Sequence, residues 1–269
     1  MHDQGYGTGR SALRALIGAG FALPGPVPVK AGTPSRRIGH GTALAALCSA
    51  LLPLPAGAAT RGFTISSFDA IRVDAPVSVI LTTGTGASAR AEGDDAAVDR
   101  LKVDVSGRLL TVTMDRLRPG ERSSGTATLR LSTGAVERVV LTGGGSIAIN
   151  RMKGLRGQII LGGNGDVSVA DVQLDQIDLM LAGGGRMTLA GRAGIANVRV
   201  TGPGSVAAES LHARQAAVGN DGPGSIALTA EVNAKVTATG SGDVTITGKA
   251  ACSVDNRGVG RVTCGGEGD

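Results

Sequence analysis

The chain has 269 residues, of which 44 are glycine, with no tryptophan, one tyrosine and three phenylalanines. This composition disfavours an ordinary α/β enzyme, whose core and ligand pockets depend on large side chains. A hydrophobic fraction of 42% with only 18% charged residues excludes a disordered chain. The lack of a Gly-X-Y period excludes collagen.

The formal net charge of +5 is concentrated at the N-terminus. Residues 1–59 carry five basic residues against one acidic residue, whereas the rest of the chain carries 22 basic and 21 acidic residues. A protein that binds nucleic acid is expected to show a basic stripe in its folded part, and the sequence shows none. The charge pattern therefore indicates no nucleic-acid partner.

Residues 1–59 are interpreted as an N-terminal extension with a secretory signal peptide. Arg36 and Arg37 precede an apolar run at 42–54, and the small residues at 56–58 provide a cleavage site. That run is shorter than the ~20 residues that span a bilayer, and no later segment can cross a membrane as a helix. We therefore expect an exported mature domain, 60–269, located in the periplasm or at the cell surface.

After the leader, five segments alternate apolar and polar residues and are predicted strands. Their turns contain Gly84, Gly93 and Gly107, at less regular spacing than the turns farther along the chain. We interpret these strands as irregular first coils and a cap of one solenoid, with a separate β-sandwich as the alternative. The five segments are Phe68–Val73, Val77–Leu81, Leu101–Val105, Leu109–Thr113 and Thr128–Leu131.

Residues 137–264 repeat a unit of strand, Gly-x-Gly turn and strand seven times, and the first glycines of the turns are 18 to 20 residues apart. An aliphatic residue lies four positions before and four positions after each first glycine, among small or polar neighbours. The residues before the turns are Val139, Ile159, Leu179, Val198, Val218, Val236 and Val254. Those after the turns are Ile147, Val167, Met187, Val206, Ile226, Val244 and Val262.

A single unit of this size cannot bury its apolar stripe, whereas stacked units place equivalent residues over one another at about 4.8 Å. We therefore predict an all-β fold: a single-stranded parallel β-helix of about seven 18–20-residue coils, plus irregular N-terminal β coils. The crossover rule favours a right-handed coil. We expect the turn glycines to be required because tight turns often need a positive φ.

The strand Phe68-x-x-Ile71-x-Val73, the turn Gly93-Asp94, a pair of Leu-x-Val strands and the stacked Gly-x-Gly-x-Val coils carry a resemblance. Together they resemble the head GIN domain family, whose members are called putative auto-transporter adhesins. The resemblance covers about 62–265. It implies an adhesin-like solenoid and no catalytic motif.

No catalytic, cofactor or metal site is predicted. The Gly-x-Gly runs are followed by strands, whereas a phosphate-binding loop needs a helix there. Asp166 and Asp243 follow glycine turns but do not fit the nine-residue calcium repeat. We expect these two aspartates to lie over Arg186 and Arg261 as cross-strand ion pairs. His212, the only histidine after the leader, has no partner motif.

Two sets of candidate site residues remain. Cys252 and Cys264 flank the last glycine turn at core positions, and in an oxidising compartment they can form a disulfide; two buried free thiols are the alternative. Arg151, Lys153 and Arg156 are predicted to form a basic binding loop for an acidic glycan.

The sequence thus predicts an exported, non-enzymatic β-helical protein with an adhesive, surface-binding or structural role in the envelope. Its expected partner is a glycan or an envelope protein. A polysaccharide-active β-helix enzyme is one alternative. A solenoid that forms homo-oligomers through its unpaired end strands is another.

Overall fold

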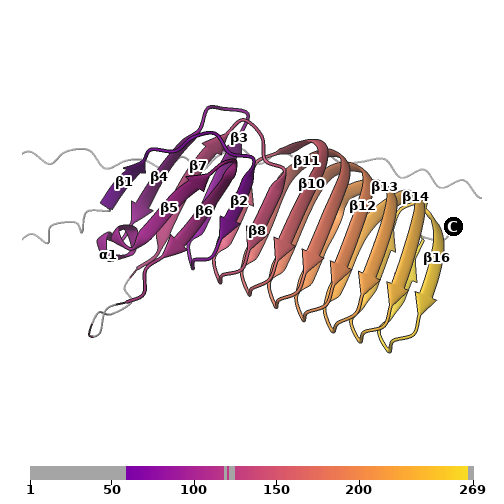
Figure 1. Cartoon of the computed structure of the whole chain (residues 1–269). Coiled ribbons are helices and arrows are strands. Elements are labelled where there is room, and N and C mark those ends of the chain that lie inside the picture. The colour runs from indigo at the N-terminus through magenta and orange to yellow at the C-terminus, as the bar shows by residue number, and fades with distance from the viewer. Residues whose placement is uncertain (1–58, 118–119, 121–124, 266–269) are drawn as a thin grey trace, which may run out of the picture. The chain divides into compact units, whose positions relative to one another are not determined.

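The computed structural model describes residues 59–117, 120 and 125–265, and the predicted signal peptide lies outside them. Within these residues, 17 strands hydrogen-bond into one continuous sheet that winds into a stack of coils (Figure 1). The predicted all-β solenoid is confirmed. The parallel coils make about six turns, because the seventh glycine turn belongs to an incomplete last coil.

The N-terminal part contains seven strands and the helix α1 (Asp95–Asp99). These strands are β1 (Ala59–Phe63), β2 (Ala70–Val73), β3 (Ser78–Thr83), β4 (Ser88–Gly93), β5 (Leu101–Ser106), β6 (Leu109–Met114) and β7 (Ala127–Thr133). The solenoid continues with β8 (Arg138–Leu141), β9 (Ser146–Ile149), β10 (Met152–Leu161), β11 (Asp166–Leu181), β12 (Arg186–Val200), β13 (Ser205–Asn220), β14 (Ser225–Ala238), β15 (Val244–Thr247), β16 (Ala251–Asn256) and β17 (Val262–Cys264).

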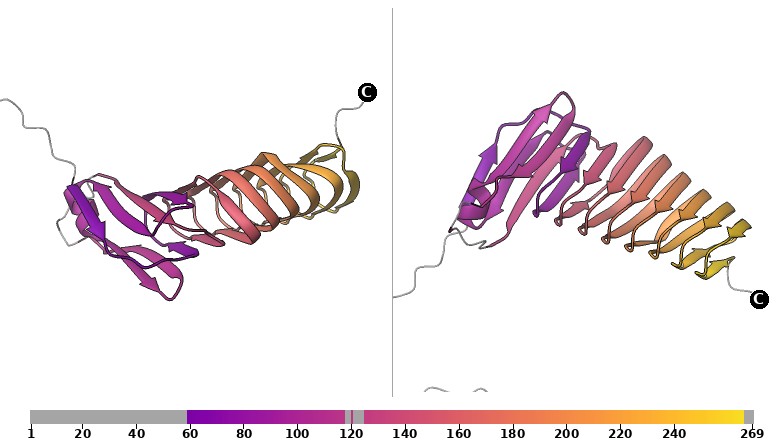
Figure 2. Two further views of the ribbon diagram at one scale, coloured as in Figure 1. Left: turned by 90° about the horizontal axis from the view of Figure 1, so that it is seen from above. Right: turned by 60° about the horizontal axis from the view of Figure 1, so that its bottom comes forward.

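Each regular coil has three parts. The strand segment before a glycine turn, such as 177–181, belongs to what we call the pre-turn sheet. The segment after the turn, such as 186–189, belongs to the post-turn sheet, and a return segment, such as 191–195, leads to the next pre-turn segment. Each part pairs in parallel with the same part of the next coil. In β11, β12 and β13 the post-turn, return and pre-turn segments follow one another as one long bent strand (Figure 2).

The register places the predicted core residues directly over one another. Val218 pairs with Val198 on one side and with Val236 on the other, and the remaining residues before and after the turns follow the same register. Of the fourteen, twelve are at most 3% exposed. The exceptions are Val254, which is 45% exposed, and Val262, which is half-buried, because both lie in the last coil and no described residue covers them.

The N-terminal strands extend both sheets but do not stack in chain order. The coil of β2 and β3 lies between β6–β7 on one side and β8–β9 on the other, and all these pairings are parallel. Beyond β6 and β7, the strands β5, β4 and β1 pair in antiparallel fashion. Helix α1, whose Asp94 N-cap accepts from two backbone N–H groups, buries Ala97 and Val98 at this end. The start of the solenoid is therefore a mixed-sheet cap.

The turn glycines are explained by close stacking and not by backbone conformation. The expectation of a positive φ is wrong for them, since the positive-φ glycines all lie outside the seven repeat turns. Instead, a Cβ on Gly185 would overlap the carbonyl oxygen of Gly165 in the preceding coil, and a Cβ on Gly242 would overlap that of Gly224. Adjacent turns therefore approach so closely that no side chain fits between them.

Two neighbouring glycines in one turn give a matched test of this explanation. A Cβ on Gly145 would overlap the backbone of Val77, whereas a Cβ on Gly144 would meet nothing within 4 Å. We expect Gly145→Ala to lower the free energy of unfolding by about 1–3 kcal/mol, the usual cost of overpacking. Gly144→Ala should be neutral or stabilising by up to ~1 kcal/mol. Denaturant unfolding measures both, and equal effects would contradict close stacking.

Asp74 connects the coil of β2 and β3 to the coil of β8 and β9 through a side-chain hydrogen bond. Its carboxylate accepts hydrogen bonds from Arg72 Nε, at 2.7 Å, and from Thr142 Oγ1, which follows β8. Burial acts to raise the pKa of Asp74, but the hydrogen bonds from Arg72 and Thr142 and the charge of Arg72 outweigh it. The pKa of this carboxyl therefore lies below its usual value of 3.8.

A carboxyl whose pKa is lowered by folding makes stability depend on pH. Its contribution is present above the unfolded-state pKa and is lost as pH falls through the lower folded-state pKa. We expect Asp74→Asn to lower the free energy of unfolding at neutral pH and to make its decline below about pH 4 shallower. Asp104→Asn, at an exposed position, is the control and should leave the curve unchanged. A pH series of unfolding midpoints that is identical for all three proteins would refute this role.

Candidate binding groove on the solenoid

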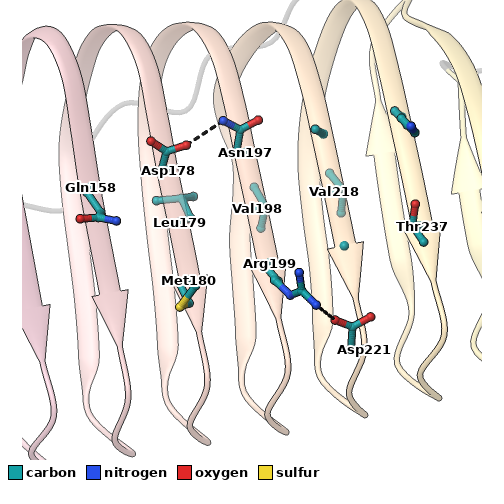
Figure 3. Close-up of a pocket in the computed structure, with 13 residues that line it drawn as sticks. Gln158, Asp178, Leu179, Met180, Asn197, Val198, Arg199, Val218, Asp221 and Thr237 are labelled. Carbon is teal, nitrogen blue, oxygen red and sulfur yellow. Dashed lines mark hydrogen bonds and ion pairs between the residues drawn. The ribbon is translucent and has the colours of Figure 1, made fainter.

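A shallow groove of about 530 Å³ crosses the outer face of the pre-turn sheet from β10 to β14 (Figure 3). It is lined by the outward-pointing side chains, which are every second residue along these strands. From one coil to the next, one lane of these positions runs Gln158, Asp178, Asn197, Ala217 and Lys235. The neighbouring lane runs Met180, Arg199, Gly219 and Thr237.

The hollow exists because β13 contributes almost no side chain to this face. Ala217 and Gly219 occupy its two outward positions, while β12 and β14 carry longer side chains beside them. A Cβ on Gly219 would meet nothing nearer than 3.9 Å, so the packing of the fold does not require glycine there. The floor is therefore open space that a ligand can occupy.

Hydrogen bonds hold the polar walls in place. Asn197 Nδ2 donates to Asp178 Oδ1 at 2.7 Å, and Gln176 Nε2 donates to the same carboxylate at 3.2 Å. Arg199 forms an ion pair with Asp221 at 2.7 Å (Figure 3). The groove thus offers fixed carboxylate, amide and guanidinium groups around an apolar floor, a combination suited to binding a polar ligand with several hydroxyl groups.

The return segments carry a second hollow, of about 880 Å³, at the corner of the column. Its lining includes Arg192, Arg214 and His212, and the His212 Nδ1 lies 3.1 Å from Glu231 Oε1. Lys153, Gln173, Arg192 and His212 follow one another in register. The carboxylates Asp175 and Glu231 also border this corner, so its two arginines are balanced by two acidic residues.

The three basic residues singled out in the sequence lie close to this corner but not on a loop. Lys153 and Arg156 belong to the strand β10, because residues 152–156 pair with the return segment of β11. Both side chains are exposed. Arg151 precedes the strand and forms an ion pair with Asp171 at 2.7 Å. Two of the three cations therefore project from a strand, and the third is held by a carboxylate.

The aspartates after the glycine turns lie over arginines as predicted, yet the expected ion pairs do not form. Asp166 is in register with Arg186, but Arg186 Nε donates to Ser205 Oγ at 3.3 Å. Asp243 Oδ1 accepts from the backbone N–H of Arg261 at 2.8 Å instead of from its guanidinium. The ion pairs do not form because Arg186 and Asp243 each hydrogen-bond to another neighbouring group on the exposed face of the sheet.

The structure joins Cys252 and Cys264 by a disulfide with a Cα–Cα distance of 6.2 Å. The bond links β16 to β17 and so connects the two sheets in the last coil. Cys252 is exposed and Cys264 half-buried, because none of the residues that the structure describes covers the core positions of the last coil.

The residues of the groove were not singled out in the sequence. Aligning the seven repeats would show that the outward position five residues before each first glycine is Arg138, Gln158, Asp178, Asn197, Ala217, Lys235 and Ser253. The single alanine in this otherwise polar column is the signal that could have located the hollow.

Two further properties bear on function. Among the residues that the structure describes, no group of three or more His, Cys, Asp or Glu side chains is placed to hold a metal ion. No helix in this same part of the chain is long and apolar enough to cross a bilayer.

A family model described as "Putative auto-transporter adhesin, head GIN domain" matches residues 67–250. No curated protein matches the chain. Among solved structures, a putative adhesin from Bacteroides fragilis is similar at a TM-score of 0.70 and 20% identity, covering 77% of this chain and 96% of that chain. A putative lipid binding protein from Parabacteroides distasonis has a TM-score of 0.61 and 21% identity, covering 78% and 97%. At such identities the likeness shows the fold alone.

Proposed function

Because the chain belongs to the head GIN domain family, we propose that it is an exported, non-enzymatic adhesin that binds a glycan of the cell envelope or of another surface. The groove on the pre-turn sheet is the proposed binding site. The observation that carries this proposal is the lane Asp178–Asn197–Ala217–Lys235, in which the hydrogen-bonded Asp178 and Asn197 on one side and Lys235 on the other border the small Ala217.

The chemistry of the groove fits a sugar chain. Carboxylate, amide and guanidinium groups can each pair with neighbouring hydroxyls, and Asp178 on β11 and Asn197 and Arg199 on β12 supply one of each. Ala217 and the exposed Met180 offer apolar surface for the C–H face of a sugar ring. An extended polymer crossing the strands would meet the polar side chains of β11 and β12, then the small residues of β13, then those of β14, at about 4.8 Å per strand.

The non-enzymatic part of the proposal is supported by what the groove's carboxylates already do. Asp178 accepts from Asn197 and Gln176, and Asp221 accepts from Arg199 and from Thr239 Oγ1 at 2.9 Å. Both carboxylates therefore orient neighbouring side chains. Family members and similar structures are likewise described as adhesins or binding proteins.

Export is supported by the Cys252–Cys264 bond, because disulfides persist in oxidising compartments. The predicted leader agrees with it. Lys153 and Arg156 are proposed as a second contact, used only when the glycan is acidic, because both project from β10 as exposed cations.

Filling the groove tests the proposal. Ala217→Leu places a larger side chain on the floor, and we expect at least a ten-fold loss of affinity across a panel of neutral and acidic oligosaccharides measured by calorimetry. Ala148→Leu is the matched control, since Ala148 is an exposed alanine on the post-turn sheet, and it should bind like the unmodified protein. Binding that survives Ala217→Leu would place the site elsewhere. No binding to any member would refute a glycan ligand, and shortened products would show an enzyme.

The acidic members of the panel test the second contact. We expect the double variant Lys153→Ala, Arg156→Ala to weaken binding of acidic oligosaccharides while neutral ones bind unchanged. The weakening should shrink as salt rises, because exposed charges are screened. An equal loss for neutral sugars would mean that the substitutions disturb the fold, and no loss would remove these residues from the site.

A further inference from the structure

The two ends of the column are built differently. At the C-terminal end, β16 pairs only with β14 and β17 pairs only with β15 among the described strands, so each leaves one edge without a strand partner. The core is open there as well: Val254 is 45% exposed, whereas Val236, one coil earlier, is fully buried. Unpaired edges beside exposed core residues are a template for adding further strands.

The N-terminal end differs in that its edge strands β1 and β5 pair with their neighbours in antiparallel fashion and its core is covered. The antiparallel strands β1, β4 and β5 and helix α1 cover that end, and Leu101, Ala97 and Val98 are at most 2% exposed. Head-to-tail stacking would need an open parallel coil at both ends of the molecule. The same coil of a second copy is the partner whose two edge strands match β16 and β17 in spacing and bring equivalent core residues together.

We propose that two copies of this chain associate end to end through β16 and β17. A two-fold axis perpendicular to both sheets, passing near Val254 and Val262, would place each edge strand antiparallel to its own copy. Val254 and Val262 lie at equal separations from the first glycine of the last turn, so one axis serves both sheets. Each Val254 would then cover the partner's Val254, and the aliphatic core would run unbroken through the dimer.

The outward side chains of this register are complementary. Ser253 lies opposite the partner's Asp255, and Arg261 lies opposite the partner's Thr263, so that no like charges face each other directly. Within each copy, Arg257 already forms an ion pair with Asp255 at 2.8 Å. Moving the axis by one residue along β16 would place Asp255 opposite the partner's Asp255 and Val254 opposite the partner's Asn256, so that like charges would face each other and the valine contact would be lost.

The contact is small, since it involves the six residues of β16 and the three of β17. It falls below the ~1,600 Å² of a standard interface, so we expect a reversible dimer with a dissociation constant on the order of 10 µM or weaker. The symmetry leaves both pre-turn sheets on one side. The dimer would therefore present two grooves to one surface, and bivalent attachment strengthens binding without new contacts.

Sedimentation velocity of the purified protein from about 1 to 500 µM tests the proposal. We expect a monomer–dimer equilibrium that stops at the dimer. Val254→Lys should weaken dimerisation at least ten-fold, because it places two like charges at the axis. Val259→Lys is the matched control: this valine belongs to the same coil, is 91% exposed at the turn, and should leave the dissociation constant within two-fold.

Thermal unfolding shows whether each variant is folded, and oligosaccharide binding by the monomeric variant separates this proposal from the one on the groove. A monomer at every concentration, continued growth beyond a dimer, or an unchanged dissociation constant for a folded Val254→Lys would overturn the proposal. So would a protein that dimerises only after residues 266–269 are removed, because that segment would then be the occupant of the open end.

Discussion

The close approach of successive glycine turns is the constraint on which the rest of this structure depends. Neighbouring coils are held at strand spacing, and at the turns this leaves no room for a Cβ between one backbone and the next. Backbone hydrogen bonds such as Gly224 N to Gly202 O, at 3.1 Å, join the turns directly. The enclosed core is correspondingly thin, so that valine, leucine, isoleucine and alanine fill it and aromatic residues are nearly absent.

The same regularity determines where a binding site can arise. Inward positions are fixed by stacking, whereas outward positions are free to vary without changing the register. Small residues at two outward positions of β13 are enough to open a groove, and the flanking coils provide its polar walls. Function in such a scaffold therefore depends on the outward lanes. The last coil adds a different surface, because a regular stack ends in unpaired strands unless something covers them.

The repeating part of the fold could be predicted in detail because a period of 18 to 20 residues fixes both strand parity and register. Val198, Val218 and Val236 lie where that period places them. The cap could be predicted less well: its strands were foreseen from alternation, but β1, β4 and α1 were not, and neither was the insertion of the β2–β3 coil between later coils. Long-range pairing of irregular strands leaves no period in the sequence. The groove was missed because Ala217 and Gly219 form it by being small.

The central claim is that equivalent residues of successive coils are in direct contact, and nuclear Overhauser effects between labelled valine methyl groups test it most directly. The account predicts strong effects from Val198 to Val218 and from Val218 to Val236. It predicts a much weaker effect, or none, between Val198 and Val236, which lie two strand spacings apart, about 9.6 Å. Absence of the two neighbouring contacts in the folded protein, or a strong contact that skips a coil, would contradict the stacked architecture.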